Sequence, residues 1–382
     1  MSAGMPNWEL VEDDATLQRV LQDNAGAAAV AVDTEFMRRN TFYPQIALLQ
    51  LCFGDTAWLV DPLAISDTSG LAALLTDPSV VKVLHSPSED LEVFNKWLGV
   101  QPDPLFDTQR AAALLDRGFG LGYRALVAAV CDVDLPKDET RSDWLQRPLT
   151  EAQCHYAAQD VLYLLAVYHE LQAACEAAGK VDWVLADGAD ATAAQQAGPE
   201  PYYTRIKSGW KLNPRQLGAL AALCQWREDT ARERDKPRSW IITDQDCLQI
   251  ARALPRDRAQ LRAAAELQPA AQRRYADAIL EVLGQHAEQP DSAMPAPLPA
   301  PPGGRERDLA KRLKGKARAL AAELEVAPEI LLNSRDYDAL VRRAGNGEGT
   351  PMPRHWQGWR RERVIDPLVR FLAEHGFKES GA

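Results

Sequence analysis

The first 180 residues combine short apolar runs with stretches in which apolar residues recur every three or four positions. The short runs are bounded by turn residues, and they predict strands at 27–32, 46–53, 57–60 and 80–84. The helical spacing predicts helices near 87–98, 107–116, 121–130 and 150–176. Ser86 with Glu89, and Thr150 with Gln153, have the spacing of capping boxes for the first and last of these helices. Strands followed by helices predict a mixed sheet with helices packed on it.

From residue 205 onward the apolar pattern is helical throughout. Asn213 and Pro214 have the order of an N-cap and a first helical residue, and apolar residues follow them at helical spacing. The same pattern returns at 309–324, with basic residues on the polar side. This part of the chain therefore predicts small all-helical domains.

Two breaks interrupt these patterns. Residues 186–201 lack apolar periodicity, and residues 287–304 are rich in Pro, which predicts an extended, semi-stiff linker. We therefore divide the chain into four regions: a mixed α/β domain at 1–204, a helical domain at 205–290, a linker at 291–304 and a second helical domain at 305–382.

Composition indicates an ordinary soluble globular protein with two or three domains, since 46% of the 382 residues are hydrophobic and 25% are charged. No apolar run approaches the roughly 20 residues of a membrane span, and Met1–Leu10 does not have the pattern of a secretory signal. The six cysteines form no C-x-x-C pair, which argues against a zinc site or a disulfide framework. A reduced, cytoplasmic setting is expected.

The net charge of −11 is unevenly distributed. Residues 1–204 carry 12 Lys and Arg against 30 Asp and Glu, a net charge of −18, whereas 205–290 and 305–382 each carry +4. This asymmetry fits a metal-dependent catalytic domain followed by modules that bind phosphate. A surplus of this size is also common on plain solvated helices, so charge alone does not distinguish phosphate-binding modules from ordinary helical domains.

Asp33 and Glu35 lie just after the first predicted strand, which runs directly into Asp33. Side chains alternate along a strand, so both carboxylates point to the same face. Two adjacent carboxylates repel each other unless a cation neutralises them or one keeps its proton. Oxygen ligands at this spacing suit a hard cation such as Mg²⁺ or Mn²⁺. The alternative is a solvated strand end, where this spacing occurs by chance.

Asp90 and Asp160 each lie on an otherwise apolar helix face. Val93 and Phe94 follow Asp90 at helical spacing, and Tyr156 precedes Asp160 by one turn. A buried carboxylate needs a partner, and a metal is one. The alternatives are a first-turn acid that favours the helix dipole and a core tyrosine bonded to an aspartate. Four acids from three separate elements nevertheless match the construction of a two-metal site that cleaves phosphodiesters.

Three stretches resemble the motifs of the ribonuclease D family, within the DEDD exonuclease superfamily: VDTEFMRRNTFYPQIALLQL (32–51), HSPSEDLEVF (85–94) and RSDWLQRPLTEAQCHYAAQDVLYLL (141–165). Residues 206–285 look like the helicase-and-RNase-D C-terminal (HRDC) domain, and 305–377 resemble a second, divergent copy. The resemblance implies an α/β ribonuclease-H-like exonuclease domain, a mixed sheet with helices, followed by two small all-α domains.

The resemblance also implies an activity: hydrolysis of structured RNA such as tRNA precursors from a free 3′ end, with release of nucleoside 5′-monophosphates. The expected cofactors are two divalent metal ions, Mg²⁺ or Mn²⁺, with no organic cofactor and no membrane partner. In the family pattern, Asp33 would bridge both metals, and Glu35 and Asp160 would complete the metal that activates water. Asp90 would help to hold the second metal, and Tyr156 would orient the attacking water.

The helix motif of the superfamily occurs in a Tyr form and a His form, and this sequence fits both. Tyr156 lies four residues before Asp160, whereas His155 lies five residues before it and about 100° away around a helix. The in-phase spacing favours Tyr156, and His155 is then a flanking surface residue.

Seven residues are candidates for contact with RNA: Gln45, Phe42, Arg141, Lys211, Arg215, Arg234 and Lys236. Gln45 would lie near the scissile end, Phe42 could stack on a terminal base, and the cations would contact phosphates. Tyr43 and Trp144 are further candidates for stacking. Core packing of the aromatic residues and plain solvation of the cations are the alternatives.

Other functions share parts of this pattern. Proofreading domains of DNA polymerases use the same acids, and these motifs do not distinguish the two sugars. A catalytically dead scaffold would lack one or more of the four acids, and all four are present. The helical modules could also bind proteins rather than RNA, which the salt dependence of binding would reveal.

Overall fold

The structure, a computed structural model, describes residues 7–135, 142–198, 201–346 and 352–375. Contacts between residues divide the chain into two units. Unit 1 comprises Met1–Met37, Ile46–Ala197 and Pro302–Ala382, and unit 2 comprises Arg38–Gln45 and Gly198–Pro301. The chain therefore passes from one unit to the other at both ends of the segment 38–45, after Ala197 and within the linker region.

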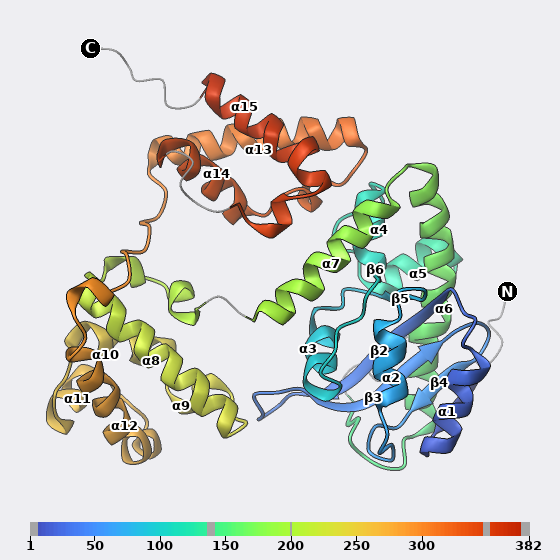
Figure 1. The fold of residues 1–382 in the computed structure, drawn as a ribbon, viewed down its shortest axis with the longest axis horizontal. Coiled ribbons are helices and arrows are strands. Elements are labelled where there is room, and N and C mark those ends of the chain that lie inside the picture. The colour runs from blue at the N-terminus through green and yellow to red at the C-terminus, as the bar shows by residue number, and fades with distance from the viewer. Residues whose placement is uncertain (1–6, 136–141, 199–200, 347–351, 376–382) are drawn as a thin grey trace. The chain divides into compact units, whose positions relative to one another are not determined.

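Unit 1 is built on a six-stranded mixed sheet in the order β1-β4-β3-β2-β5-β6 (Figure 1). The strands are β1 Trp8–Val11, β2 Ala29–Met37, β3 Gln45–Cys52, β4 Ala57–Val60, β5 Val81–Leu84 and β6 Leu105–Asp107. β5 pairs in parallel with β2 and β6, β1 pairs in parallel with β4, and β3 and β4 are antiparallel. The four predicted strands are confirmed. β1 and β6 were not predicted because neither shows a continuous apolar run: Glu9 interrupts the four residues of β1, and β6 has only three residues and ends in Asp107.

The α-helices within the described residues are α1 Asp14–Asp23, α2 Ser69–Thr76, α3 Ser88–Trp97, α4 Thr108–Leu114, α5 Tyr123–Cys131, α6 Glu151–Ala177, α7 Val181–Ala197, α8 Pro214–Glu233, α9 Arg238–Ile241, α10 Asp244–Ala253, α11 Arg258–Ala264, α12 Pro269–Ala287, α13 Gly304–Leu324, α14 Ser334–Asn346 and α15 Asp366–His375. The expected helices of the first domain are confirmed, and so is the capping box of Thr150 and Gln153 that starts α6. In the described part of the chain, no helix is both long and apolar enough to cross a bilayer.

Two hydrophobic cores lie on opposite faces of the sheet because the side chains of β2 alternate between them. Ala29 and Ala31 belong to the core that includes α4, α5 and α6, whereas Val30 and Val32 belong to the core that includes α1, α2 and α3 (Figure 1). Odd-numbered side chains of β2 therefore face α6, and even-numbered ones face α3. This alternation positions the residues that follow on the same strand.

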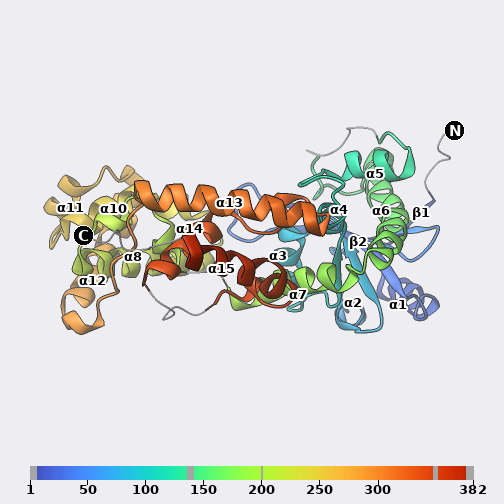
Figure 2. The same ribbon diagram turned by 90° about the horizontal axis from the view of Figure 1, so that it is seen from above.

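Helices α13, α14 and α15 form a bundle (Figure 2) within unit 1. Two short helical turns between them, Pro328–Ile330 and Arg354–Trp356, contact α4 and α7 respectively. The side-chain amine of Lys180 donates hydrogen bonds to the carbonyls of Leu114 at 2.9 Å and Glu325 at 2.8 Å. The rings of Trp183 and Trp359 stack with their centroids 4.4 Å apart. The bundle therefore docks on α7 through both polar and aromatic contacts.

Asp187 on α7 is the polar centre of this contact. Its carboxylate accepts hydrogen bonds from Arg110 at 3.0 Å and from the buried Arg360 at 2.8 Å. Burial raises the pKa of Asp187, but the hydrogen bonds and charge of Arg360, followed by those of Arg110, lower this pKa by more, so the net shift is downward. Asp187 is thus an ionised group shared by two elements that are distant in the sequence.

The predicted break at 186–201 is wrong over most of its length, since α7 continues to Ala197. Apolar periodicity is missing because the buried face of α7 uses a charge and a glycine. A Cβ atom at Gly188 would lie 2.2 Å from the carbonyl oxygen of Leu105, so only glycine fits this close approach of α7 to β6.

The predicted capping box at Ser86 is also wrong. Helix α3 begins at Ser88, Pro87 occupies the cap position, and no side-chain cap hydrogen bond forms. Ser86 has a φ of 56° and its backbone N–H donates instead to the carboxylate of Asp107 at 3.0 Å. Ser86 thus bonds to Asp107 at the end of β6 rather than to Glu89 in the predicted capping box.

Unit 2 is a bundle of α8 to α12 with the segment 38–45 packed into its core. The capping residues of α8 are as predicted: Asn213 forms a capping box with Gln216, and Pro214 is the first helical residue. Asp235 holds the 38–45 segment, since its carboxylate accepts the backbone N–H groups of Phe42 at 2.9 Å and Tyr43 at 3.0 Å.

Asp187→Ala should lower the free energy of unfolding by about 3–5 kcal/mol, because it leaves the buried Arg360 without its counterion. Asp190→Ala is a matched control on the same helix. Asp190 pairs with Arg354, whose side chain is 66% exposed, and its removal should cost less than about 1 kcal/mol. Chemical denaturation followed by tryptophan fluorescence measures both variants, and equal losses would contradict the role given to Asp187.

Candidate active site

Strand β2 presents Asp33 and Glu35 to the face of the sheet that α6 covers, because they continue the odd-numbered series of Ala29 and Ala31. Thr34, between them, points to the opposite face, where α3 lies. Three consecutive residues thus supply side chains to both faces at the end of one strand.

Helix α6 brings Asp160 to the first of these faces. Carboxylate oxygens of Asp33, Glu35 and Asp160 all lie within 4.8 Å of one another. Asp160 is held in place because its neighbours Val161 and Leu164 are buried in the core beneath the sheet. The structure therefore brings together three of the four acids that the sequence singles out.

Asp90, the fourth acid, reaches the site from α3 and is buried. Its carboxylate accepts a hydrogen bond of 2.5 Å from the hydroxyl of Thr34. Asp90 is also close enough to Asp33 for its charge to raise the Asp33 pKa. Thr34 therefore holds the fourth carboxylate beside the other three.

All four acids have pKa values above their ordinary range. Burial is the largest cause for Asp33 and Glu35, followed by the charges of the neighbouring carboxylates. Burial raises the pKa of Asp160 to about 7 and that of Asp90 to about 6, although hydrogen bonds from Tyr156 and Thr34 oppose it. A divalent cation would reverse this effect, and a set of carboxylate oxygens alone suits Mg²⁺, Mn²⁺ or Ca²⁺ rather than a soft metal.

Tyr156 lies one turn before Asp160 and donates a hydrogen bond to its carboxylate. Burial raises the pKa of Tyr156 far above its usual value, and the charges of Asp160, Glu35 and Asp33 raise it further. The phenol is therefore protonated at neutral pH and available as a donor. His155 instead packs edge-on against Trp8, with ring centroids 6.1 Å apart.

Three residues around the site were not singled out from the sequence: Thr34, His85 and Tyr123. Burial lowers the pKa of His85 to about 4, so its ring is neutral; Nε2 donates to the carbonyl of Leu121 at 3.1 Å and Nδ1 contacts the Thr108 hydroxyl at 2.9 Å. The charges of Asp160 and Asp33 contribute to the raised pKa of Tyr123, which places its phenol near the acids. Strand alternation could have indicated Thr34, but no local pattern indicates Tyr123.

The candidate RNA contacts are scattered in the structure. Arg141 lies outside the described residues, and Gln45 is exposed at the start of β3. Phe42 is buried in unit 2, where the guanidinium groups of Arg232 and Arg238 lie 4.7 and 4.6 Å from the centre of its ring. In this structure, therefore, Phe42 packs with arginines in the interior of unit 2.

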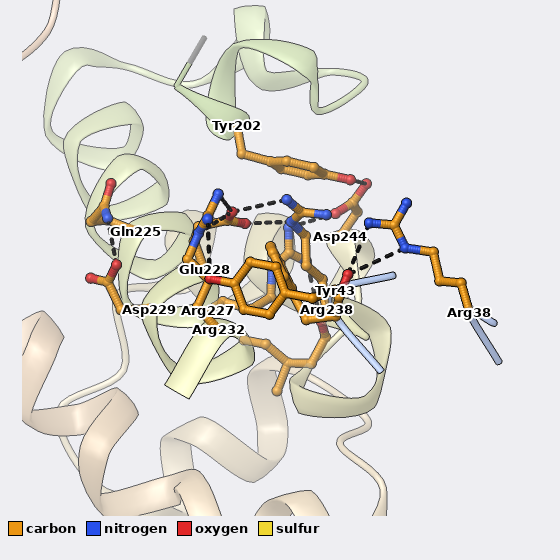
Figure 3. A network of polar contacts seen from close by, with 12 residues as sticks. Arg38, Tyr43, Tyr202, Gln225, Arg227, Glu228, Asp229, Arg232, Arg238 and Asp244 are labelled. Carbon is orange, nitrogen blue, oxygen red and sulfur yellow. Dashed lines mark hydrogen bonds and ion pairs between the residues drawn. The ribbon is translucent and has the colours of Figure 1, made fainter. Parts of the chain in front are cut away.

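The basic residues of unit 2 differ in how far they are already engaged. Arg215 pairs with Asp291 and donates to the carbonyl of Gln289 at 2.7 Å. Lys236 is half-buried, with its amine 3.4 Å from the carbonyl of Asn40. A second group, in Figure 3, is engaged by an acid although it is partly exposed: Glu228 accepts hydrogen bonds from Arg232 and Arg238, the two arginines that flank Phe42.

Two of the candidate cations remain exposed. Lys211 lies beside the ring of Trp210, 5.4 Å from its centre, and Arg234 lies 5.5 Å from the ring centre of Tyr275. Neither is held in an ion pair among the described residues. These two are therefore the more accessible members of the predicted set.

Comparison with known proteins agrees with this geometry. The pattern of the 3′-5′ exonuclease family matches residues 8–176, and that of the HRDC domain matches residues 216–283. Ribonuclease D of Pseudomonas paraeruginosa is 42% identical over 369 residues, covering 96% of this chain and 98% of the relative. Ribonuclease D of Escherichia coli is 34% identical and covers 97% and 99% of the two chains.

The crystal structure of Escherichia coli RNase D, described as an exoribonuclease involved in structured RNA processing, superposes with a TM-score of 0.90 over 97% of this chain and 99% of that one. The exonuclease fold implies divalent metals, and the acidic cluster is in place to hold them. These matches span both the exonuclease domain and the helical C-terminal region, since they cover 98–99% of each relative. This chain belongs to the ribonuclease D family of 3′→5′ exoribonucleases.

Proposed function

We propose that this exoribonuclease works with two divalent ions, Mg²⁺ or Mn²⁺, held by Asp33, Glu35, Asp90 and Asp160. The observation that carries the proposal is the convergence of three carboxylates within 4.8 Å, with raised pKa values that a cation would relieve. Asp33 is central to the cluster and suits a ligand shared by both ions. When bound, the ions would make hydroxide available near neutral pH and offset the charge on the phosphate and the leaving 3′ oxygen.

The protein's own groups orient the reaction. The phenol of Tyr156 stays protonated, so it can donate one hydrogen bond and hold the attacking water through its oxygen, but it cannot act as the base. Asp160 accepts from that phenol and fixes its direction. Thr34 holds Asp90 from the opposite face of the strand. Hydrolysis between the last two nucleotides would release a nucleoside 5′-monophosphate.

The substrate we propose is structured RNA with a free 3′ end, tRNA precursors among them, in the cytoplasm. The helical domains proposed at 205–290 and 305–382 would contact the body of the RNA while the 3′ end enters the acidic site. The matched HRDC domain and the exposed Lys211 and Arg234 support this role for the first of them. The remaining contacts, at Gln45, Phe42, Arg141, Arg215 and Lys236, stay predictions.

With Mg²⁺ or Mn²⁺, the protein should shorten an RNA with a single-stranded 3′ tail one nucleotide at a time. EDTA or Asp33→Asn should reduce the rate by about 100-fold or more, because the acids then lack their cations or the central ligand. Asp55→Asn is the matched control, since Asp55 is exposed in the turn after β3. Products are resolved by size over time.

A 3′-blocked RNA should resist cleavage, and a DNA of the same sequence measures the choice of sugar. Degradation of RNA by Asp33→Asn at the normal rate would refute the proposed site. Faster cleavage of DNA than of RNA would refute the proposed substrate.

Metal binding should stabilise the protein more as the pH rises. The raised pKa values of Asp90 and Asp160, about 6 and 7, mean that the folded, metal-free protein keeps protons that the unfolded chain loses above about pH 4. Its stability therefore falls as the pH rises through this window, and cations that replace the protons should restore it.

Thermal denaturation with EDTA or with excess MgCl₂ or MnCl₂, between about pH 5.5 and 8, measures this effect. The metal-induced increase in Tm should grow with pH and should be much smaller in Asp160→Asn. An increase that is the same at both ends of the range would contradict proton–metal competition at these acids.

Lys211→Glu and Arg234→Glu should weaken RNA binding without changing kcat at saturating RNA, because both residues lie outside the acidic cluster. The logarithm of the RNA-binding constant falls as the logarithm of salt concentration rises, and each lost phosphate contact should make this slope shallower by about 0.7–0.9. Binding is measured in the Asp33→Asn background, so that the RNA stays intact. Arg258→Gln is the control, since Arg258 already pairs with Asp277. Unchanged slopes would assign unit 2 to a different partner.

A further inference from the structure

Arg147, in the segment that precedes α6, uses all five of its N–H donors. Nε and Nη2 form a bidentate pair with Asp61 at 2.6 and 2.7 Å, and Nη2 also donates to the carbonyl of Ala47 at 2.7 Å. Nη1 donates to the carbonyls of Trp144 at 2.9 Å and Gln146 at 2.7 Å. A fully used guanidinium of this kind defines a geometry that no other side chain reproduces.

The acceptors belong to different parts of unit 1. Ala47 lies within β3, and Asp61 directly follows β4, where its backbone N–H donates to the carbonyl of Val11 on β1. Trp144 and Gln146 belong to the loop at 142–149. Arg147 therefore ties this loop to β3 and to the end of β4, which Asp61 in turn joins to β1.

The ion pair is partly shielded from solvent: the side chain of Asp61 is 6% exposed and that of Arg147 is 24% exposed. Burial raises the pKa of Asp61, but the hydrogen bonds from Arg147 and from the N–H of Leu63 lower it by more. The carboxylate is therefore ionised at neutral pH, where it pairs with Arg147.

Trp144 is the residue that this anchor places. Its ring is buried, 2% exposed, and its centroid lies 6.0 Å from that of Tyr156. The indole N–H has no hydrogen-bond partner among the described residues. No polar contact of its own side chain fixes the indole, so its position depends on packing and on its carbonyl, which Arg147 holds.

Gln153 provides a second brace for the same loop. Its amide donates to the hydroxyl of Ser142 at 2.9 Å and accepts from the side-chain amide of Gln146 at 3.2 Å. Gln153 lies on α6 one turn before Tyr156 and is fully buried. The loop and the first turns of α6 are therefore held together as one piece.

We infer that Arg147 is a positioning residue for Tyr156: by holding the backbone of Trp144 against the sheet, it fixes the indole on which the Tyr156 ring rests. This rests on the proposed role of Tyr156 in orienting the attacking water. A phenol bonded to Asp160 can still swing about that bond, and the indole wall limits this movement. A displacement of about 1 Å in such a group costs up to about 100-fold in rate.

Arg147→Lys tests the inference. Lysine keeps a positive charge beside Asp61, but its three donors cannot reach the carbonyls of Ala47, Trp144 and Gln146 together. We expect kcat on a tailed RNA to fall by about 10-fold or more, whereas KM and the metal-induced increase in Tm should stay close to those of the unchanged enzyme. Arg110→Lys, at the Asp187 ion pair elsewhere in unit 1, is the matched control and should keep full kcat.

A double-mutant cycle with Tyr156→Phe separates positioning from plain stabilisation. If Arg147 acts through the Tyr156 phenol, Arg147→Lys should slow Tyr156→Phe by less than about twofold, because the group to be positioned is already gone. Losses that multiply, or an unchanged kcat in Arg147→Lys, would overturn the inference. Trp144→Leu should reproduce the same cycle with the ion pair intact, and it replaces Arg147→Lys if that variant does not fold.

The outcomes also separate this inference from the proposed function. Full activity of Tyr156→Phe would refute the role of Tyr156, and the inference with it. A slow Tyr156→Phe enzyme beside a fast Arg147→Lys enzyme would refute the inference alone.

Discussion

The mutual repulsion of carboxylates packed within 4.8 Å is the constraint on which the rest of unit 1 depends. No single element could hold them: β2 supplies Asp33 and Glu35, α6 supplies Asp160 and α3 supplies Asp90. Their raised pKa values show that the fold keeps them together against burial and against one another. The apolar cores on the two faces of the sheet stabilise this arrangement, and the bound cations of an exonuclease of this family would relieve the repulsion.

Polar anchors, rather than further apolar contacts, set the finer geometry of the site. Thr34 orients Asp90, the neutral ring of His85 links the start of α4 to the loop before α5, and Arg147 and Gln153 brace the loop before α6. Each anchor links backbone segments that are far apart in the sequence. Directional hydrogen bonds suit this task because apolar packing excludes water but tolerates rotation and small shifts.

Local periodicity explains what could be predicted from the sequence. Patterns only a few residues long predict the strand that leads into Asp33, the helix that starts after Thr150, and the placement of Tyr156 and Asp160 on one helix face. Tertiary partners are not: Ser86 donates to Asp107 instead of capping a helix, and the buried face of α7 depends on ionic contacts of Asp187 with residues 77 and 173 positions away. Contacts between residues so far apart produce no periodic pattern in the sequence, so the extent of α7 could not be predicted.

The arginines of unit 2 show why the net charge of a domain does not tell how many of its cations are available to bind RNA phosphates. Arg232 and Arg238 flank the ring of Phe42 and share Glu228, and Arg215 is bound to Asp291 and nearby carbonyls. Arg232 and Arg238 pack on the segment that follows β2, and Arg215 joins the start of α8 to the residues after α12. Phosphate contacts compete for donors, and donors already used within the fold are costly to withdraw. An RNA path over this unit must therefore run through its exposed cations, and the surplus of charge alone does not locate it.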